Sequence, residues 1–297
     1  MAEVGVNEIR ALLGAKPRPQ GWAARRARIE EVGAVWPAAP DISLEQAALD
    51  GVAAEWSLAP ESDPSRAILF FHGGGYCSGS ILSHRRMASE AGRAAGARAL
   101  AVAYRLAPEH PFPAAYEDAL AAWRFLRAQG YAANKIAVGG DSAGGGLTLA
   151  LLMRLRDLQE ALPACAWLVS PWTDLTLSGE TLTTKDAADP LLHRPYLEEL
   201  AQAYVPAGVD RKDPRVSPLF GAFGGLPPLL IQVGSEETLL ADSTRLAAAA
   251  GAAEVSVTLE IWPRMIHAWH LWNARLPEAR RALAQTGAFV QARFAAD

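Results

Sequence analysis

The sequence predicts an α/β fold, in which a mostly parallel sheet is covered by helices on both faces. Three observations support this prediction. Apolar runs of strand length recur along the chain, helical stretches lie between them, and glycine or proline follows most of the runs. The runs are apolar along their whole length, which is typical of parallel strands buried on both faces. Strands that alternate with helices indicate a layered sheet.

The expected strands are the apolar runs at 67–71, 97–103, 135–138, 164–170, 229–233 and 255–262. The expected helices lie at 114–129, 143–160, 243–250 and 277–294. Two segments do not follow this alternation: residues 1–50 are helix-like, and residues 176–225 are interrupted by polar residues, proline and glycine. Long segments of this kind after strand ends are commonly lids. We therefore expect a main domain at 51–297, and a helical cap formed by 1–50 and by an insertion at roughly 176–225.

Composition excludes several classes of protein. The chain has 297 residues, a net charge of −4 and no long run of basic residues, so the charge pattern of a nucleic-acid-binding protein is missing. Two cysteines, Cys77 and Cys165, form neither a disulfide framework nor a metal-binding pattern. The N-terminus lacks the basic and apolar regions of a signal peptide, and no apolar window approaches membrane-spanning length. The expectation is a soluble cytoplasmic protein without nucleic-acid or membrane partners.

A G-x-S-x-G motif stands between the predicted strand at 135–138 and the helix that follows it. Its residues are Gly140, Asp141, Ser142, Ala143 and Gly144. Small neighbours allow the backbone to turn sharply, so that the serine hydroxyl projects at the N-terminal end of the helix. The motif predicts that Ser142 is a nucleophile. The alternative is a glycine-rich helix start that binds phosphate or packs closely.

A second glycine motif, His72-Gly73-Gly74-Gly75, follows the strand at 67–71 directly. Acyl transfer creates an oxyanion, which needs preorganised N–H donors, and glycines let the backbone approach without a side chain in the way. In hydrolases of the G-x-S-x-G type such a loop and the residue after the nucleophile form the oxyanion hole. We predict that Gly74, Gly75 and Ala143 donate these hydrogen bonds. A plain glycine turn is the alternative.

These motifs, with YRLAPEHPFPAA (Tyr104–Ala115) between them and DPRVSPL further on, resemble the bacterial hormone-sensitive lipase-like esterases of the α/β-hydrolase superfamily. The resemblance runs from about residue 67 to the C-terminus. It implies an eight-stranded α/β-hydrolase core, a helical cap, a Ser–acid–His triad, ester substrates and no cofactor. Dimers are common among similar proteins, so a homodimer through the C-terminal sheet edge is a further expectation.

The general base is expected to be His267. Histidine suits proton transfer near neutral pH, and in this fold the triad runs serine, acid, histidine along the chain. That order leaves His193, His267 and His270. His193 falls in the predicted cap, and His270 falls in the next helical stretch, where packing or solvent exposure is expected. His267 follows the last strand, where the resemblance also places the base. None of the six histidines has metal-ligand spacing, so no metal site is expected.

The acid is expected just beyond the strand at 229–233. Relatives mostly have aspartate there, and alignment of the following apolar pair puts Glu237 at that position. Glutamate is tolerated in this role. Glu236 is the neighbouring alternative and Asp174 a distant one. Asp242 is expected to cap the next helix.

Several other residues are expected to have structural roles. Asp141 and Glu109 are predicted to fix loops, His72 to support the oxyanion loop, and Cys77 to be a small buried apolar residue. A second group consists of aromatic residues that either pack in the core or line the pocket: Tyr76, Trp172, Trp262, Trp269 and Trp272 in the main domain, and Trp22, Trp36 and Tyr196 in the cap.

The sequence thus predicts a serine carboxylesterase with a Ser142–Glu237–His267 triad, which acts on small-molecule esters of short to medium acyl chain. An amidase, deacetylase, lactonase or carbamate hydrolase would use the same triad and stays an alternative. A non-catalytic ligand receptor on the same fold is an alternative of another class, and it is disfavoured because both Ser142 and His267 are present.

Overall fold

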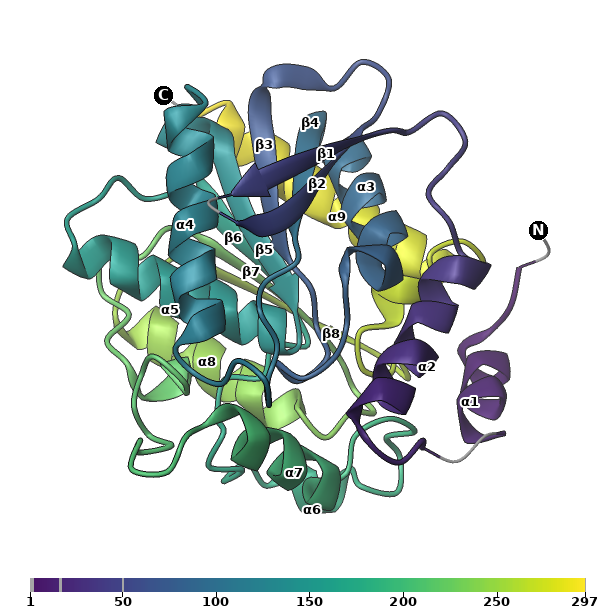
Figure 1. Ribbon diagram of the computed structural model, residues 1–297. Coiled ribbons are helices and arrows are strands. Elements are labelled where there is room, and N and C mark those ends of the chain that lie inside the picture. The colour runs from purple at the N-terminus through teal and green to yellow at the C-terminus, as the bar shows by residue number, and fades with distance from the viewer. Residues whose placement is uncertain (1–2, 16–17, 50, 297) are drawn as a thin grey trace.

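A computed structural model describes residues 3–15, 18–49 and 51–296, and it contains one eight-stranded sheet (Figure 1). The strands are β1 (Ser43–Leu49), β2 (Val52–Leu58), β3 (Asp63–Phe71), β4 (Ala97–Val102), β5 (Ile136–Asp141), β6 (Cys165–Val169), β7 (Leu229–Gly234) and β8 (Val257–Trp262). They lie in the order β1-β2-β4-β3-β5-β6-β7-β8. The pairs β1–β2 and β2–β4 are antiparallel, and every later pair is parallel. The prediction of a mostly parallel eight-stranded sheet is confirmed.

The helices are α1 (Val6–Gly14), α2 (Trp22–Val35), α3 (Ile81–Ala95), α4 (Ala114–Ala128), α5 (Ala143–Asp157), α6 (Thr181–Thr184), α7 (Arg194–Tyr204), α8 (Leu240–Ala252) and α9 (Pro277–Phe294). Short 3-10 turns occur at Ala133–Lys135, Pro218–Phe220 and Trp269–Trp272. In the part of the chain that the structure describes, no helix has both the length and the apolar character needed to cross a membrane.

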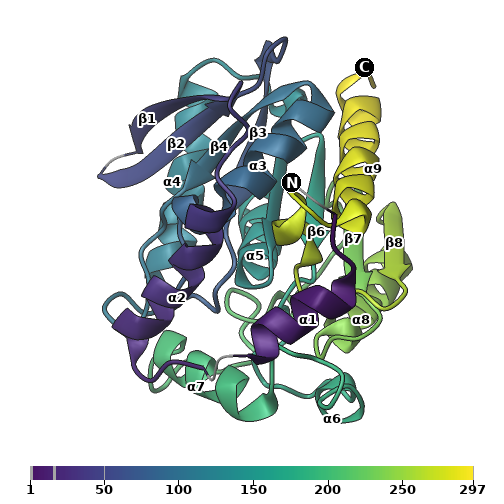
Figure 2. The same ribbon diagram turned by 90° about the vertical axis from the view of Figure 1, so that its right-hand side faces the viewer.

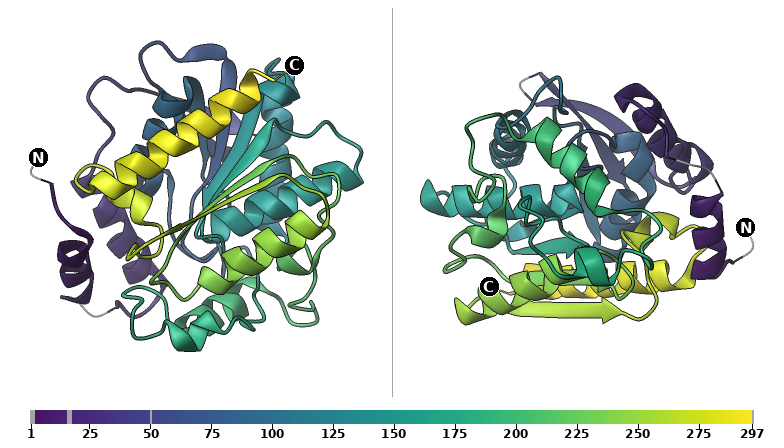
Figure 3. Two further views of the ribbon diagram at one scale, coloured as in Figure 1. Left: turned by 180° about the vertical axis from the view of Figure 1, so that it is seen from behind. Right: turned by 90° about the horizontal axis from the view of Figure 1, so that it is seen from below.

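Helices cover both faces of the sheet, as predicted (Figure 3). Successive residues of a strand point to opposite faces, and β3 illustrates this: Phe70 packs with α3 and α9, whereas Phe71 packs with α4 and α5. On the second face α8 packs beside α5 through Leu246. Because β5, β6 and β7 are buried on both sides, their sequences are largely apolar, which is the pattern from which the parallel sheet was predicted.

The segments assigned to the cap gather at the end of the molecule where the parallel strands finish. Figure 2 shows α1, α2, α6 and α7 together at that end. The division into cap and main domain stays a prediction, but its first boundary needs correction. Ser43–Leu49 forms β1 and pairs with β2, so the N-terminal part of the cap ends before Ser43 rather than at residue 50. The pattern of β1 is hard to recognise because most of its side chains are exposed at the sheet edge.

Helices α3 and α9 approach each other closely at Gly287. A Cβ atom there would lie 2.3 Å from the carbonyl oxygen of Ala94, a backbone atom that cannot turn away. We expect Gly287→Ala to lower the free energy of unfolding by about 1–3 kcal/mol, because it overpacks a filled contact. Gly251→Ala on α8 is the matched control: nothing lies within 4 Å of its Cβ position, so we expect no loss of stability. Urea unfolding of both variants measures this, and equal stabilities would contradict it.

Candidate active site

Ser142 sits on a strained turn between β5 and α5. Its backbone angles are φ 53° and ψ −120°, a region that non-glycine residues rarely adopt. The neighbouring glycines make the turn possible: a Cβ on Gly140 would lie 2.5 Å from Gly144, and one on Gly144 would lie 2.0 Å from the carbonyl oxygen of Phe71. The Ser142 N–H donates to the Val169 carbonyl at 2.8 Å, which fixes the turn to β6. The structure therefore has the local geometry that the G-x-S-x-G motif predicts.

His267 and Glu237 form a buried pair next to this turn. His267 Nδ1 lies 3.0 Å from Glu237 Oε2, and both side chains are buried. Burial lowers the pKa of His267, but the hydrogen bond and the charge of Glu237 outweigh it, so this pKa is raised above 6.5. Burial in turn raises the pKa of Glu237, and the contact with His267 opposes that shift. The carboxylate thus orients the imidazole and favours its protonated form.

Glu236, the neighbouring candidate for the acid, points elsewhere. Its carboxylate forms an ion pair with Arg10 of α1, and about a third of the side chain is exposed. Glu237 is fully buried, and its Oε1 accepts hydrogen bonds from Ser170 Oγ at 2.9 Å and from the Gly234 N–H at 2.5 Å. Of the two glutamates, only Glu237 contacts His267.

Ser170 links the acid to the base, and sequence reasoning missed it. It follows β6, and its hydroxyl donates to Glu237 while accepting from the Ala268 N–H at 3.1 Å. One buried hydroxyl therefore holds both the carboxylate and the backbone next to His267. The only signal in the sequence was its place at the end of a strand, directly before Pro171.

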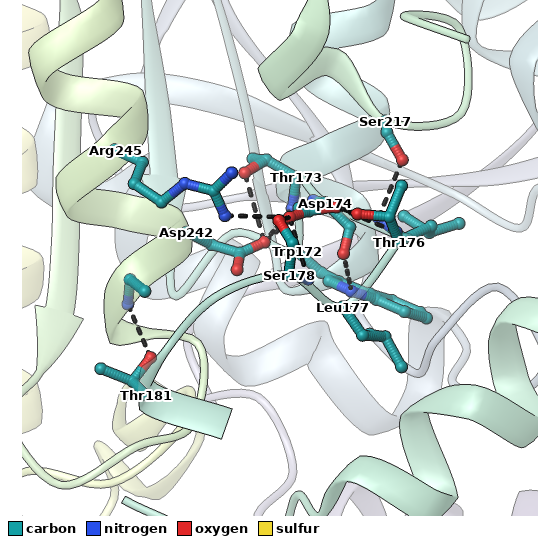
Figure 4. A network of polar contacts seen from close by, with 12 residues as sticks. Trp172, Thr173, Asp174, Thr176, Leu177, Ser178, Thr181, Ser217, Asp242 and Arg245 are labelled. Carbon is teal, nitrogen blue, oxygen red and sulfur yellow. Dashed lines mark hydrogen bonds and ion pairs between the residues drawn. The ribbon is translucent and has the colours of Figure 1, made fainter. Parts of the chain in front are cut away.

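Asp242 and Asp174 belong to a separate polar network, drawn in Figure 4. Asp242 lies in the first turn of α8 but does not cap that helix, so this prediction was wrong. Its carboxylate instead accepts the N–H groups of Thr173 and Asp174, at 2.7 and 2.9 Å. Burial is the main reason that its pKa rises to about 7. The Asp174 carboxylate accepts from Ser178 and pairs with Arg245 at 2.9 Å. Neither aspartate forms a hydrogen bond with His267; together they fix the loop after β6 to α8.

The glycine loop after β3 presents unpaired N–H groups. Gly74 and Gly75 have φ of 115° and 64°, which favour glycine. A Cβ on Gly74 would also lie 2.2 Å from the Ser78 carbonyl oxygen. No hydrogen bond within the described residues uses the N–H of Gly74, Gly75 or Ala143. Backbone N–H groups in a folded protein nearly always bind an acceptor. Since these three have none in the described residues, they are available to bind an oxyanion.

Polar contacts hold the glycine loop in place, as the sequence predicts for Asp141 and His72. The Gly73 N–H donates to Asp141 Oδ1 at 2.9 Å, and Asp141 Oδ2 lies 3.3 Å from His84 Nε2. His72 Nδ1 lies 2.8 Å from the Gly73 oxygen, and its ring stacks on Tyr104. Burial lowers the pKa of His72 to about 3, so this imidazole is neutral and serves as scaffold.

The cap reaches the same loop through Arg26 of α2. Its guanidinium donates to the carbonyl oxygens of Cys77 and Ala107, both at 2.9 Å, and pairs with Glu109 at 2.6 Å. The prediction that Glu109 fixes a loop agrees with this contact. Cys77 is buried and unpaired, and burial raises the pKa of its thiol to about 12, so it behaves as a small apolar residue.

Four of the six predicted site residues line the inner end of a cavity of about 250 Å³: Ser142, His267, Gly74 and Gly75. Glu237 and Ala143 do not line it. The outer wall comes from the N-terminal segment and the 176–225 insertion, with apolar residues that include Leu13, Ile29, Leu191, Leu192, Tyr196, Leu197 and Leu200. Leu271 and Trp272, from the 3-10 turn after β8, also line the cavity. Trp172 and Tyr196 line the cavity, whereas Tyr76 packs in the core against Tyr204.

The other two histidines considered as the base lie elsewhere. His193 is exposed and pairs with Asp186 at 3.0 Å. His270 is fully buried, which agrees with the expectation of packing rather than with that of solvent exposure. Its Nε2 lies 2.9 Å from Gln232 Oε1. Burial lowers the pKa of His270 to about 3, so it stays neutral in the core. His267 is the candidate that lies beside the serine turn with a buried carboxylate partner.

We predict that Ser170→Ala lowers turnover of an activated ester about 10- to 100-fold, since a hydrogen bond to a charged group is worth roughly one to two powers of ten. The loss should appear in kcat, because the variant misplaces the acid and the base rather than the cavity wall. Ser243→Ala is the matched control, because Ser243 is a buried serine whose hydroxyl has no hydrogen-bond partner in the described residues. A Ser170 variant as active as the Ser243 variant would contradict this role.

Comparison with known proteins agrees with this geometry. A family model described as the alpha/beta hydrolase fold matches residues 68–271. An acetyl-hydrolase of Streptomyces hygroscopicus is 48% identical over 238 residues, which are 80% of this chain and 79% of that protein. An esterase of Acinetobacter venetianus is 35% identical over 266 residues, or 90% and 88% of the two chains. The crystal structure of an esterase from the bacterial hormone-sensitive lipase family superposes with a TM-score of 0.95 at 41% identity, over 99% of this chain and 100% of that one. The chain therefore belongs to the α/β-hydrolase fold family and, within it, to the hormone-sensitive lipase-like esterases.

Proposed function

We propose that this protein is a serine carboxylic ester hydrolase in which Ser142 is the nucleophile, His267 the general base and Glu237 the acid that orients it. One observation carries the proposal: His267, which is held by the buried Glu237, lines the same cavity as the strained serine and the glycine loop. Esterase and carboxylesterase relatives and solved esterase structures support the same reaction.

In the first half of the reaction, the neutral imidazole of His267 removes the proton of Ser142 as Oγ adds to the ester carbonyl carbon. Negative charge develops on the carbonyl oxygen, and the N–H groups of Gly74, Gly75 and Ala143 are the donors proposed to receive it. The imidazolium, stabilised by Glu237, then protonates the departing alkoxide. The alcohol leaves and an acyl group remains on Ser142.

In the second half, His267 takes a proton from water, and the resulting hydroxide adds to the acyl carbon. The second tetrahedral intermediate collapses, the imidazolium returns the proton to Ser142 and the carboxylic acid is released. No atom beyond those of the ester, water and the chain is needed. A receptor that only binds ligands would lack a member of this set, and here all of them are present.

We propose short to medium acyl chains as substrates. A cavity of about 250 Å³ that is largely apolar suits such a chain. Relatives named acetyl-hydrolase and, in Pseudomonas putida, ethyl acetate hydrolase support small acyl groups.

Replacement of the nucleophile tests the reaction itself. We expect Ser142→Ala to lower hydrolysis of nitrophenyl esters by about 10⁶-fold, the size seen when a triad serine is lost, and to abolish labelling by a fluorophosphonate. In the unaltered protein, a series of acyl lengths should peak at short to medium chains. Activity that persists in the variant would remove Ser142 from the mechanism, and a peak at long chains would refute the proposed acyl range.

The pH dependence tests the acid and the base. His267 acts only when neutral, and its raised pKa places the acidic limb of kcat/KM above pH 6.5. Glu237→Gln removes the charge that favours the imidazolium, so the limb should move to lower pH while the plateau falls by roughly 10²- to 10⁴-fold. Glu236→Gln is the control, and it should keep the limb and the plateau because Glu236 pairs with Arg10 at the surface. A larger effect at Glu236 would reassign the acid.

A further inference from the structure

The outer wall of the cavity is positively charged. Three arginines of the N-terminal segment, Arg18, Arg25 and Arg28, line the same cavity as Ser142 and His267. The carboxylates near Ser142 already have partners, since Asp141 binds His84 and the buried Glu237 binds His267. The cavity therefore has hydrogen-bonded carboxylates at its catalytic end and three guanidinium groups on its outer wall.

Arg18 is the arginine that lacks a counter-ion. Its Nη2 donates to the Leu191 carbonyl oxygen, and its guanidinium carbon lies 3.3 Å from the centre of the Tyr196 ring. Its Nη1 is buried and has no hydrogen-bond partner among the described residues, and none of their carboxylates forms an ion pair with it. Burial lowers the pKa of Arg18, yet an arginine stays charged in a protein. A buried guanidinium nitrogen that has no acceptor is unusual unless a ligand supplies one, and Nη1 of Arg18 is such an atom.

Arg25 adds to the charge without compensating it. Its guanidinium carbon lies 5.3 Å from the same Tyr196 ring, and its charge lowers the pKa of Arg18. Glu199 pairs with Arg25, 2.9 Å from its Nη1, and is about half exposed. The buried Asp189 also acts on Arg18, since its charge raises the pKa of that arginine, but it forms no ion pair with it. Arg28 has Glu31 as a partner at 3.3 Å at the surface. Two guanidinium groups thus converge on one tyrosine ring, and only Arg25 has a carboxylate in direct contact among the described residues.

We propose that the site is selective for esters that carry a second, anionic oxygen group, a carboxylate, and that Arg18 is the residue that recognises it. The carboxylate would lie at the arginine wall while the ester carbonyl lies at Ser142, because both are parts of one cavity. A guanidinium pairs with a carboxylate through charge-assisted N–H donors, and these are strong in a site shielded from water. The inference rests on the proposed esterase function and narrows its substrate class. The carboxylate takes no part in the chemistry.

Two pairs of matched substrates test this, one with the charge on the acyl side of the ester and one with the charge on the alcohol side. The acyl-side pair is 4-nitrophenyl hydrogen adipate and 4-nitrophenyl 6-methylheptanoate, in which an isopropyl group replaces the carboxylate. The alcohol-side pair is 3-carboxyphenyl acetate and 3-isopropylphenyl acetate. The measured quantity is the ratio of kcat/KM for the charged and the neutral member. We expect the unaltered protein to prefer the charged member in at least one pair.

Three variants assign that preference. Arg18→Met should lower the ratio by about tenfold or more, mainly through KM, since a hydrogen bond to a charged group is worth at least about that factor. Arg18→Lys, which keeps the charge, should restore part of it. Arg124→Met is the control: Arg124 lies on α4, is exposed, pairs with Glu160 and does not line the cavity, so the ratio should not change.

The outcomes separate this inference from the esterase function. Preference for the neutral member in both pairs, or an equal ratio in Arg18→Met and the unaltered protein, overturns the anionic-substrate proposal while leaving the esterase. Absence of turnover for all four esters, with no fluorophosphonate labelling of Ser142, overturns both. A preference that falls in Arg18→Met and weakens as salt is added supports the ion pair.

Discussion

The buried contact between Glu237 and His267 is the interaction on which the rest of the site depends. Two ionisable groups removed from water are costly unless they are paired and hydrogen-bonded, and breaking such a pair costs about 3–5 kcal/mol. The structure meets this requirement with two further donors to the carboxylate, Ser170 Oγ and the Gly234 N–H. The strand ends that carry these groups are adjacent in the sheet, since β6 pairs with β7. The order of the strands is therefore what allows the pair to be both buried and satisfied.

The same contacts extend from the acid to the segment assigned to the cap. The N–H and hydroxyl of Thr238, the residue after Glu237, donate to the buried Asp189 at 2.8 and 3.1 Å. Asp189 also accepts the N–H groups of Leu191 and Leu192, both of which line the cavity. A carboxylate of the 176–225 insertion thus fixes the acid loop and the cavity wall at once. The cavity wall and the loop that carries Glu237 are therefore coupled through this one side chain.

The sequence predicted the parts of the protein whose roles are local. Ser142, Glu237 and His267 each follow a strand of the parallel part of the sheet, and parallel strands end at one edge, so motif and pattern together placed them in one site. The helix at Pro277–Phe294 was predicted with its bounds. Helix α3 was not predicted, because its buried side consists largely of alanine, serine and glycine, which give a weak apolar pattern. Strands β1 and β2 were missed because they are antiparallel, lie towards the sheet edge and carry glutamates.

The residues that the sequence did not reveal act between segments far apart in the chain. Ser170 reaches Ala268, and Arg10 reaches Glu236. Nothing in the local pattern of a serine or an arginine predicts such a partner, since the pairing exists only after the sheet has formed. Asp242 shows the converse error. Its position at a helix start suggested a cap, but its carboxylate accepts the N–H groups of Thr173 and Asp174 in another loop. Local propensity set the expectation, and tertiary contact decided the outcome.

Two kinds of contact hold the N-terminal segment over the cavity, and their contributions to the free energy of folding can be compared. Arg26 and Glu109 form an ion pair with both side chains partly exposed, and such pairs are worth about 0–1 kcal/mol. Val6 and Ile9 of α1 are buried against Met265, Ile266 and Trp269, and burial of each aliphatic side chain contributes roughly 1.5–3 kcal/mol. Apolar contacts are therefore what attach α1. Two of their partners, Met265 and Ile266, come directly before His267 in the chain. The Arg26–Glu109 ion pair helps to orient the N-terminal segment but contributes little of the free energy that holds it in place. The N-terminal segment therefore both lines the cavity, through Leu13, Arg18 and Ile29, and packs against residues on either side of His267, so it contributes to the shape of the site.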